Sequence, residues 1–132
     1  MFAEIRGKRG LAYDVGTQNV SEVGFGYFAV YASVDRKNAG VVKKLMLQEL
    51  EKLKLVSPLD VQEAQEYIEG NYYLGLEEVQ KTADQILFWE QAGSAQLMDK
   101  YIASIKKVSG ADVRRVVEKY FNHNVFVILE GK

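Results

Sequence analysis

The feature that most constrains the fold lies near the start of the chain, in residues 4–14, EIRGKRGLAYD. Two basic residues precede Gly10, and this pattern predicts the end of a helix. Glycine adopts the left-handed cap conformation at little cost, and cations suit the negative end of the helix dipole. We therefore expect a helix-to-strand corner, with Arg6 near the helix end and Tyr13 three residues into the strand. Side chains at such a corner are held by the scaffold and still face solvent.

Two strands are predicted after this corner, at residues 11–20 and 24–34, joined by a turn-prone run at residues 18–24. In the second strand every other residue is apolar and suits a core: Phe28, Val30, Ala32 and Val34. The opposite face carries Tyr27 and Tyr31. Two interpretations of that face stay open: a floor for binding, or tyrosines that pack under a helix with their hydroxyls in water.

Helices dominate the rest of the chain. Asp35 is a candidate N-cap for a helix over residues 36–53, which carries one apolar stripe. Two later helix starts share a capping-box pattern, in which a serine is followed by an acid three residues on: Ser57 with Asp60, and Ser109 with Asp112. These starts predict helical regions over residues 58–92 and 111–120, with a short helix over residues 97–107 between them.

Two details of the helical part carry further predictions. The 35-residue region at 58–92 contains Gly70 and Gly75, so we expect it to break into two helical pieces. The chain then closes with five consecutive apolar residues at 125–129, a pattern typical of a strand that is covered on both faces. Strands followed by helices indicate an α+β fold, with helices on one face of a mostly antiparallel sheet. At 132 residues, the chain is one domain or part of one.

Composition excludes several classes of function. Lys+Arg number 17 against 18 Asp+Glu, so no excess of positive charge favours nucleic acid or an anionic membrane as a partner. The chain has no cysteine, and no apolar run approaches the roughly 20 residues of a membrane-spanning helix. Its one histidine, His123, lies in a predicted turn, and no HXXEH, GXSXG or phosphate-binding motif is present. We therefore expect no metal bound by this chain and no peptidase activity of the chain alone.

Arg6 and Tyr13 remain as candidate functional residues. A guanidinium and a phenol both donate hydrogen bonds, so the pair could hold a peptide carbonyl or a developing oxyanion. From spacing alone, a purely structural role for both side chains is the simpler interpretation.

The chain also resembles a known family. Residues 2–13, FAEIRGKRGLAY, are similar to the LFXEIREKXGLAY signature in the non-catalytic domains of the pitrilysin/insulinase family of zinc metallopeptidases, which includes the mitochondrial processing peptidase. The likeness continues in order through residues 57–64, SPLDVQEA, residues 70–77, GNYYLGLE, and residues 108–121, VSGADVRRVVEKYF. One departure is that Tyr72 and Tyr73 stand where the family usually has small aliphatic residues.

This resemblance implies a ferredoxin-like α+β domain that faces a homologous, zinc-bearing domain or subunit. It implies that Arg6 and Tyr13 help to bind a peptide substrate and stabilise the transition state, while the zinc lies on the partner. Family domains are longer at the N-terminus, so residues 1–132 are expected to be the later part of one domain, with an open sheet edge. A homodimer through that edge is a further expectation. The alternative function is a structural or assembly subunit without a peptidase role, and a third is an independent peptide-binding module.

Overall fold

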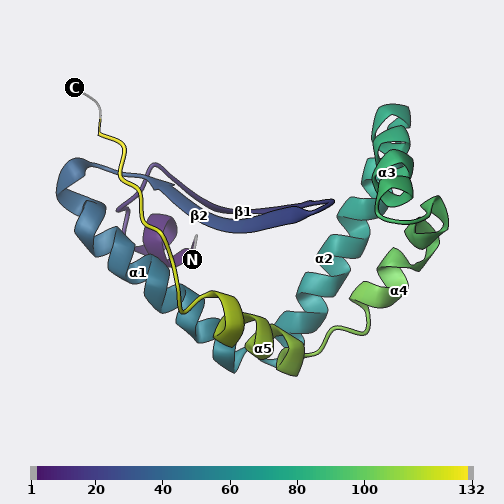
Figure 1. Ribbon diagram of the computed structural model, residues 1–132. Helices are drawn as coiled ribbons and strands as arrows, with labels where there is room; N and C mark the ends of the chain where they lie inside the picture. The colour runs from purple at the N-terminus through teal and green to yellow at the C-terminus, as the bar shows by residue number, and fades with distance from the viewer. Residues whose placement is uncertain (1–2, 131–132) are drawn as a thin grey trace. The chain divides into compact units, whose positions relative to one another are not determined.

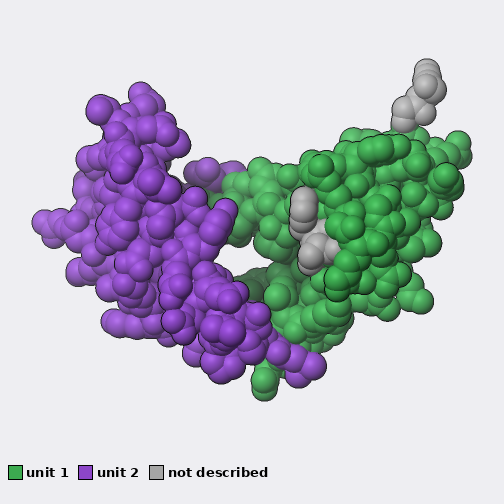
Figure 2. All heavy atoms as spheres, turned by 180° about the vertical axis from the view of Figure 1, so that it is seen from behind, with its two compact units in different colours: residues 1–21, 26–54, 114–132 green, residues 22–25, 55–113 purple. Residues whose placement is uncertain are grey.

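A computed structural model describes residues 3–130, so Phe2, the first residue of the family-like signature, lies outside the described residues. The chain divides into two compact units, coloured separately in Figure 2. Within the described part, the first unit holds residues 3–21, 26–54 and 114–130, and the second holds residues 22–25 and 55–113. Each unit is described by itself.

The first unit starts with the predicted helix-to-strand corner. A turn of wide (π) helix, Ala3–Lys8, ends at Gly10, whose φ of 59° is the left-handed cap conformation. The Gly10 N–H donates to the carbonyl of Arg6 at 3.1 Å, which closes the helix end. Beyond the corner, strand β1 (Asp14–Glu22) and strand β2 (Phe25–Ser33) form an antiparallel hairpin (Figure 1). The corner is thereby confirmed.

The hairpin turn is shorter than the sequence predicts. Residues 18–22 belong to β1, and only Val23 and Gly24 connect the strands. Gly24 has a φ of 95°, a conformation that glycine adopts without the steric penalty of a Cβ. The polar residues that suggested a longer turn are tolerated in the strand because most of their side chains are exposed.

Helix α1 (Ala39–Lys52) packs on the inner face of the hairpin, between short 3₁₀ turns at Arg36–Asn38 and Leu53–Leu55. The buried residues of this core come from the corner, β1 and α1: Ile5, Ala12, Val15, Val42 and Met46. Val30, Ala32 and Val34 pack against them, as the strand alternation predicts. Asp35 precedes the first turn, but its side chain makes no capping hydrogen bond, so its predicted N-cap role is wrong.

The predicted strand at residues 125–129 is absent. After helix α5 (Gly110–Tyr120), the described chain continues in irregular conformation, and the only sheet among the described residues pairs β1 with β2. This last segment is yellow in Figure 1. Val125 and Leu129 are 90% and 93% exposed, so the segment is not covered on both faces. An apolar run forms a strand only where a neighbouring strand satisfies its backbone, and none adjoins it here.

The second unit is helical. Helices α2 (Pro58–Leu76) and α3 (Val79–Gln91) confirm that the long helical region splits in two, although the break follows Leu76 and Gly70 lies inside α2. A 3₁₀ turn, Ala95–Lys100, leads into the short helix α4 (Tyr101–Ile105). At the start of α2 the Ser57 hydroxyl accepts from the Asp60 N–H, and the Asp60 carboxylate accepts from the Ser57 N–H. Ser109 and Asp112 form the same box before α5.

Aromatic rings connect α2, α3 and α4 in this unit. The Tyr72 ring lies 5.0 Å from the Tyr101 ring, and the Tyr101 ring lies 5.7 Å from that of Trp89. Tyr72 therefore occupies a packed site, where the resemblance leads one to expect a small aliphatic residue. Tyr72 Oη and Trp89 Nε1 are buried and make no hydrogen bond to any described residue. Burial of its hydroxyl raises the pKa of Tyr72.

The α+β class is confirmed: a hairpin with helices, one of which covers the inner face of the sheet. Within residues 3–130, no helix is both long enough and apolar enough to cross a membrane.

A stability prediction follows from the Tyr72 hydroxyl. Because this hydroxyl is buried without a described partner, we expect Tyr72→Phe to leave the free energy of unfolding unchanged or to raise it by about 1 kcal/mol. Denaturant unfolding would measure the change. The matched control is Tyr67→Phe on the same helix, where the side chain is 74% exposed and a change within about 0.5 kcal/mol is expected. A loss of more than about 1 kcal/mol for Tyr72→Phe would contradict the inference that its hydroxyl is unsatisfied.

Candidate functional site

The corner presents Arg6 and Tyr13 to solvent from a rigid base. Each follows directly after a buried residue: Ile5 is fully buried before Arg6, and Ala12 is 8% exposed before Tyr13. Both candidate side chains are exposed, and Tyr13 keeps 70% of its surface accessible. The buried neighbours fix the backbone on both sides of Gly10, so the corner can hold a guanidinium and a phenol in defined places.

Backbone pairing positions Tyr13 at the open end of the hairpin. Its N–H donates to the carbonyl of Ser33 at 2.8 Å, which extends the strand pairing one residue before β1. Its hydroxyl donates to Asp35 Oδ1 at 3.0 Å. This hydrogen bond and the charge of the carboxylate both favour the protonated phenol, so they raise the pKa of Tyr13. Tyr13 is therefore a neutral hydrogen-bond donor at physiological pH.

Asp35 is the residue of this site that sequence reasoning missed. Its position before a helix suggested a cap, whereas the structure pairs its carboxylate with Tyr13. The signal was present in the hairpin itself. Antiparallel pairing brings the residue just before the first strand close to the residues that follow the second, and Asp35 lies two residues beyond the end of β2.

The turn that carries Arg6 also carries one acidic and two further basic side chains, and these pair with one another. The Glu4 carboxylate, the nearest acid in the sequence, accepts from Arg9 Nε at 3.0 Å and lies 3.4 Å from Lys8 Nζ. Hydrogen bonds from Arg9 and then Lys8 lower the pKa of Glu4. Glu4 is thus ionised and engaged by two other cations of the same turn. The Arg6 guanidinium is exposed and carries a permanent positive charge.

The arrangement suits hydrogen-bond donation to a carbonyl or oxyanion. Arg6 can present several N–H donors in a planar fork, whereas Tyr13 has a single O–H. The Tyr13 hydroxyl already donates its hydrogen bond to Asp35. Tyr13 can therefore donate to a ligand only if the ligand replaces Asp35 as the acceptor. The structure places both residues on one corner of the first unit, and their joint action on a ligand stays a prediction.

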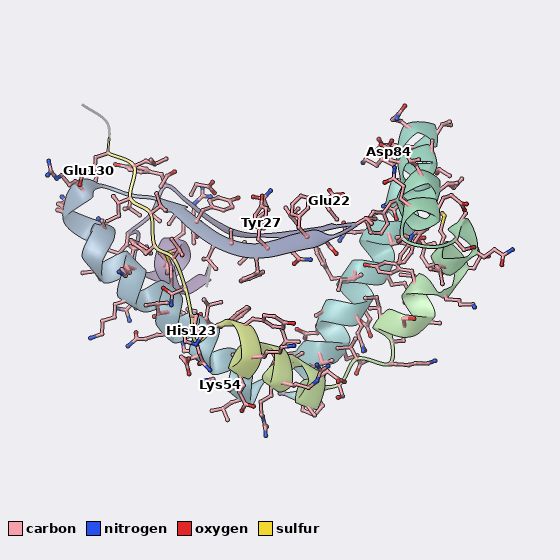
Figure 3. The ribbon with its side chains drawn as sticks, in the orientation of Figure 1. Glu22, Tyr27, Lys54, Asp84, His123 and Glu130 are labelled. Carbon is pink, nitrogen blue, oxygen red and sulfur yellow. The ribbon has the colours of Figure 1, made fainter. Side chains whose placement is uncertain are left out.

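Other residues considered in the sequence lie away from any metal-binding arrangement. His123 is exposed in the turn after α5 (Figure 3), as predicted. Within the part of the chain that the structure describes, no three His, Cys, Asp or Glu side chains gather as metal ligands.

The tyrosine-bearing face of the hairpin is open to solvent. Tyr27, labelled in Figure 3, is 50% exposed and Tyr31 is 48% exposed. This exposure disagrees with the interpretation that these rings pack under a helix. A Cβ at Gly16 would lie 2.6 Å from Tyr31 Oη, so the Tyr31 ring lies across the glycine of the neighbouring strand. Gly16 thereby allows one tyrosine to lie flat on the sheet.

Comparison with protein families identifies a match in the first half of the chain. The family described as the peptidase M16 inactive domain matches residues 1–71, which include Arg6, Tyr13 and Asp35. No curated protein is similar enough to count as a match.

Solved structures share the fold. A structure described as a protease from Helicobacter pylori superposes with a TM-score of 0.77 at 19% sequence identity, over 90% of this chain and 29% of that one. A conserved protein from Enterococcus faecalis V583 superposes with a TM-score of 0.74 at 23% identity, over 89% of this chain and 28% of that one. This chain therefore spans less than a third of the length of either protein.

The Tyr13 to Asp35 contact predicts a measurable titration. In Asp35→Asn the negative charge is lost, so the pKa of Tyr13 should fall toward its ordinary value near ~10. NMR of the tyrosine ring carbons would follow this titration, with Tyr13→Phe to assign the signal. In the parent chain the pKa of Tyr13 is higher in the folded state than in the unfolded state. The contact therefore stabilises the fold below about pH 10, and this stabilisation is lost as the pH rises through the folded-state pKa. An identical Tyr13 titration in both proteins would show that the hydrogen bond does not form in solution.

Proposed function

Because this chain belongs to the family of peptidase M16 inactive domains, we propose that it is the substrate-binding, non-catalytic half of a zinc metallopeptidase. The substrate would be a peptide or an unfolded polypeptide. Arg6 and Tyr13 would be the residues that contact it. The observation that carries this proposal is the exposure of both side chains on one rigid corner, inside the segment that matches the family.

The proposal requires a second polypeptide or domain. An inactive domain of a peptidase family implies a partner domain that carries the chemistry, and the described residues of this chain lack a metal-ligand cluster. Zinc on that partner would supply the activated water for peptide hydrolysis. The contribution of this chain is then electrostatic, because its donors stabilise negative charge that develops on the substrate carbonyl.

Within this proposal, the two donors have different tasks. The Arg6 guanidinium carries a permanent charge, so it attracts and orients a peptide carbonyl before the reaction. The Tyr13 phenol is neutral and donates a single hydrogen bond. That hydrogen bond becomes stronger as the carbonyl oxygen of the substrate becomes an oxyanion. Exchange of Asp35 for this oxyanion would move Tyr13 from its resting contact to the substrate.

A second candidate function, a structural or assembly subunit without a peptidase role, is favoured by one observation. The Tyr13 hydroxyl joins the start of β1 to the residue that follows Val34, so it ties the two open ends of the hairpin together. Under this alternative the contact between Tyr13 and Asp35 only holds the sheet edge, and no substrate displaces it.

Activity of the complete enzyme would test the proposed role. We expect Arg6→Ala and Tyr13→Phe each to lower kcat/KM on an unstructured peptide by about 10–1000-fold, since each removes one donor to the oxyanion. The assay requires this chain together with its zinc-bearing partner. The matched controls are Lys8→Ala, a cation on the same turn, and Tyr27→Phe, an exposed phenol of the same hairpin.

The two candidate functions give different results in this assay. The peptidase role predicts loss of turnover with assembly and folding intact, and unchanged activity in both controls. The structural role predicts that Tyr13→Phe lowers the stability of the chain or of its complex while turnover per folded complex stays the same. Unchanged turnover in both Arg6→Ala and Tyr13→Phe would refute the peptidase role.

A further inference from the structure

Asp35 stands at the junction between the hairpin and the first helix. Strand β2 ends at Ser33, and the 3₁₀ turn Arg36–Asn38 leads directly into α1. The backbone of Asp35, with φ −59° and ψ 141°, lies outside the helical region immediately before this turn. A short acceptor side chain in that position can bond an early N–H group of the helical segment.

The turn after Asp35 has such an N–H group to offer. The Asn38 N–H donates to the main-chain carbonyl of Asp35 at 2.8 Å, and the Ala39 N–H donates to the carbonyl of Arg36. Among the described residues, nothing accepts from the Lys37 N–H. The first N–H groups of a helical segment have no partner inside it, so they bond a side chain or water.

The Asp35 carboxylate bonds a different donor. Its Oδ1 accepts from the Tyr13 hydroxyl at 3.0 Å, and it makes no capping hydrogen bond. The adjacent cation, Arg36, is paired with Glu130, labelled in Figure 3, with 3.3 Å between Nη2 and Oε2. No cation among residues 3–130 forms an ion pair with Asp35. The phenol is therefore the group that holds this carboxylate.

One carboxylate thus lies beside two donors, the Tyr13 hydroxyl and the Lys37 N–H. It already reaches the first. The second is the N–H two residues ahead, which is the usual partner of a capping side chain. Rotation about the side-chain bonds of aspartate moves its oxygens between staggered positions. Because the side chains of Tyr13 and Asp35 are both exposed, this rotation does not disturb the core.

We propose that Asp35 is a positioning residue for Tyr13 that exchanges between these two donors. In the empty site its carboxylate holds the Tyr13 hydroxyl. When a substrate carbonyl takes the hydrogen bond of that hydroxyl, the carboxylate turns to the Lys37 N–H. This inference rests on the substrate-binding role proposed for Arg6 and Tyr13, and it adds the residue that decides how readily the phenol becomes available.

The exchange keeps the carboxylate bonded in both states. A carboxylate that was displaced with no second donor would lose a hydrogen bond, and this loss would weaken substrate binding. The Lys37 N–H, which otherwise bonds water, replaces the phenol as the donor. Asp35 therefore acts on the affinity for the peptide more than on the rate of the chemical step.

Amide hydrogen exchange on the 132-residue chain tests this inference without a partner. Tyr13→Phe frees the carboxylate, so the Lys37 amide should exchange about fivefold more slowly, the factor that corresponds to one net hydrogen bond. In the double variant of Tyr13→Phe with Asp35→Ala, this slowing should disappear. The matched control is Tyr27→Phe, an exposed phenol of the same hairpin, which should leave the Lys37 amide unchanged.

Kinetics of the complete enzyme on the same unstructured peptide separate the two donors. Serine is a preferred N-cap with a shorter side chain, so Asp35→Ser leaves the phenol without its competing acceptor and should lower KM. Glutamate reaches the phenol but is a poor N-cap, so Asp35→Glu should raise KM. We expect each KM to change about three- to tenfold, and kcat to change less. The control Asp14→Asn removes a charge next to Tyr13 in the sequence and should keep the parent KM.

The outcomes distinguish this inference from the function on which it rests. Lower turnover in Arg6→Ala and Tyr13→Phe, with the same KM in Asp35→Ser and Asp35→Glu, overturns the exchange and leaves the proposed function intact. An unchanged Lys37 amide in Tyr13→Phe, with folding checked by circular dichroism, also overturns it. Unchanged turnover in both Arg6→Ala and Tyr13→Phe refutes the proposed function, and the exchange with a substrate is refuted with it.

Discussion

The structure of the first unit depends on the packing of one helix against one face of a two-stranded hairpin. A hairpin of two strands is marginally stable in water, and it needs an apolar surface to cover its inner face. Helix α1 supplies that surface through Val42 and Met46, and the corner before β1 adds Ile5 from the other side. Because the corner shares this core, the buried residues Ile5 and Ala12 anchor the backbone on both sides of Gly10. This packing therefore fixes where the backbone of Arg6 and Tyr13 lies.

That rigid base gives two exposed side chains different chemical characters. Glu4 is engaged by Lys8 and Arg9, so the turn that carries Arg6 has more positive than negative charge. Tyr13 is held as a neutral donor by Asp35. In the proposed function, this permanent cation and this neutral donor stabilise negative charge on an oxygen atom of the substrate. Membership in a family of inactive peptidase domains agrees with such a supporting role.

Among the described residues, one edge of the same hairpin has no neighbouring strand, and this explains one point where sequence reasoning was wrong. Residues 125–129 have the composition of a covered strand, but a strand is defined by a partner that lies elsewhere in the chain or in another chain. Here a groove separates them from β2, and their backbone makes no sheet. Asp35 is a second case. Local sequence favours a cap before a helix, yet the hairpin brings a phenol close enough to engage the same carboxylate.

The sequence by itself determined the elements whose signals are local. Gly10 ends a helix because few other residues tolerate its left-handed conformation, and the boxes at Ser57 and Ser109 start helices because serine and an acid three residues later satisfy each other's backbone donors. The alternation in β2 correctly predicted that Val30, Ala32 and Val34 pack on the core, whereas Phe28, predicted to join them, is 41% exposed and stacks on Phe121. Only the tertiary structure decided what depends on contacts between distant residues: the partner of Asp35, the packed site of Tyr72 and the unpaired edge of β2. Such contacts are set by how whole elements pack, and no short stretch of sequence encodes them.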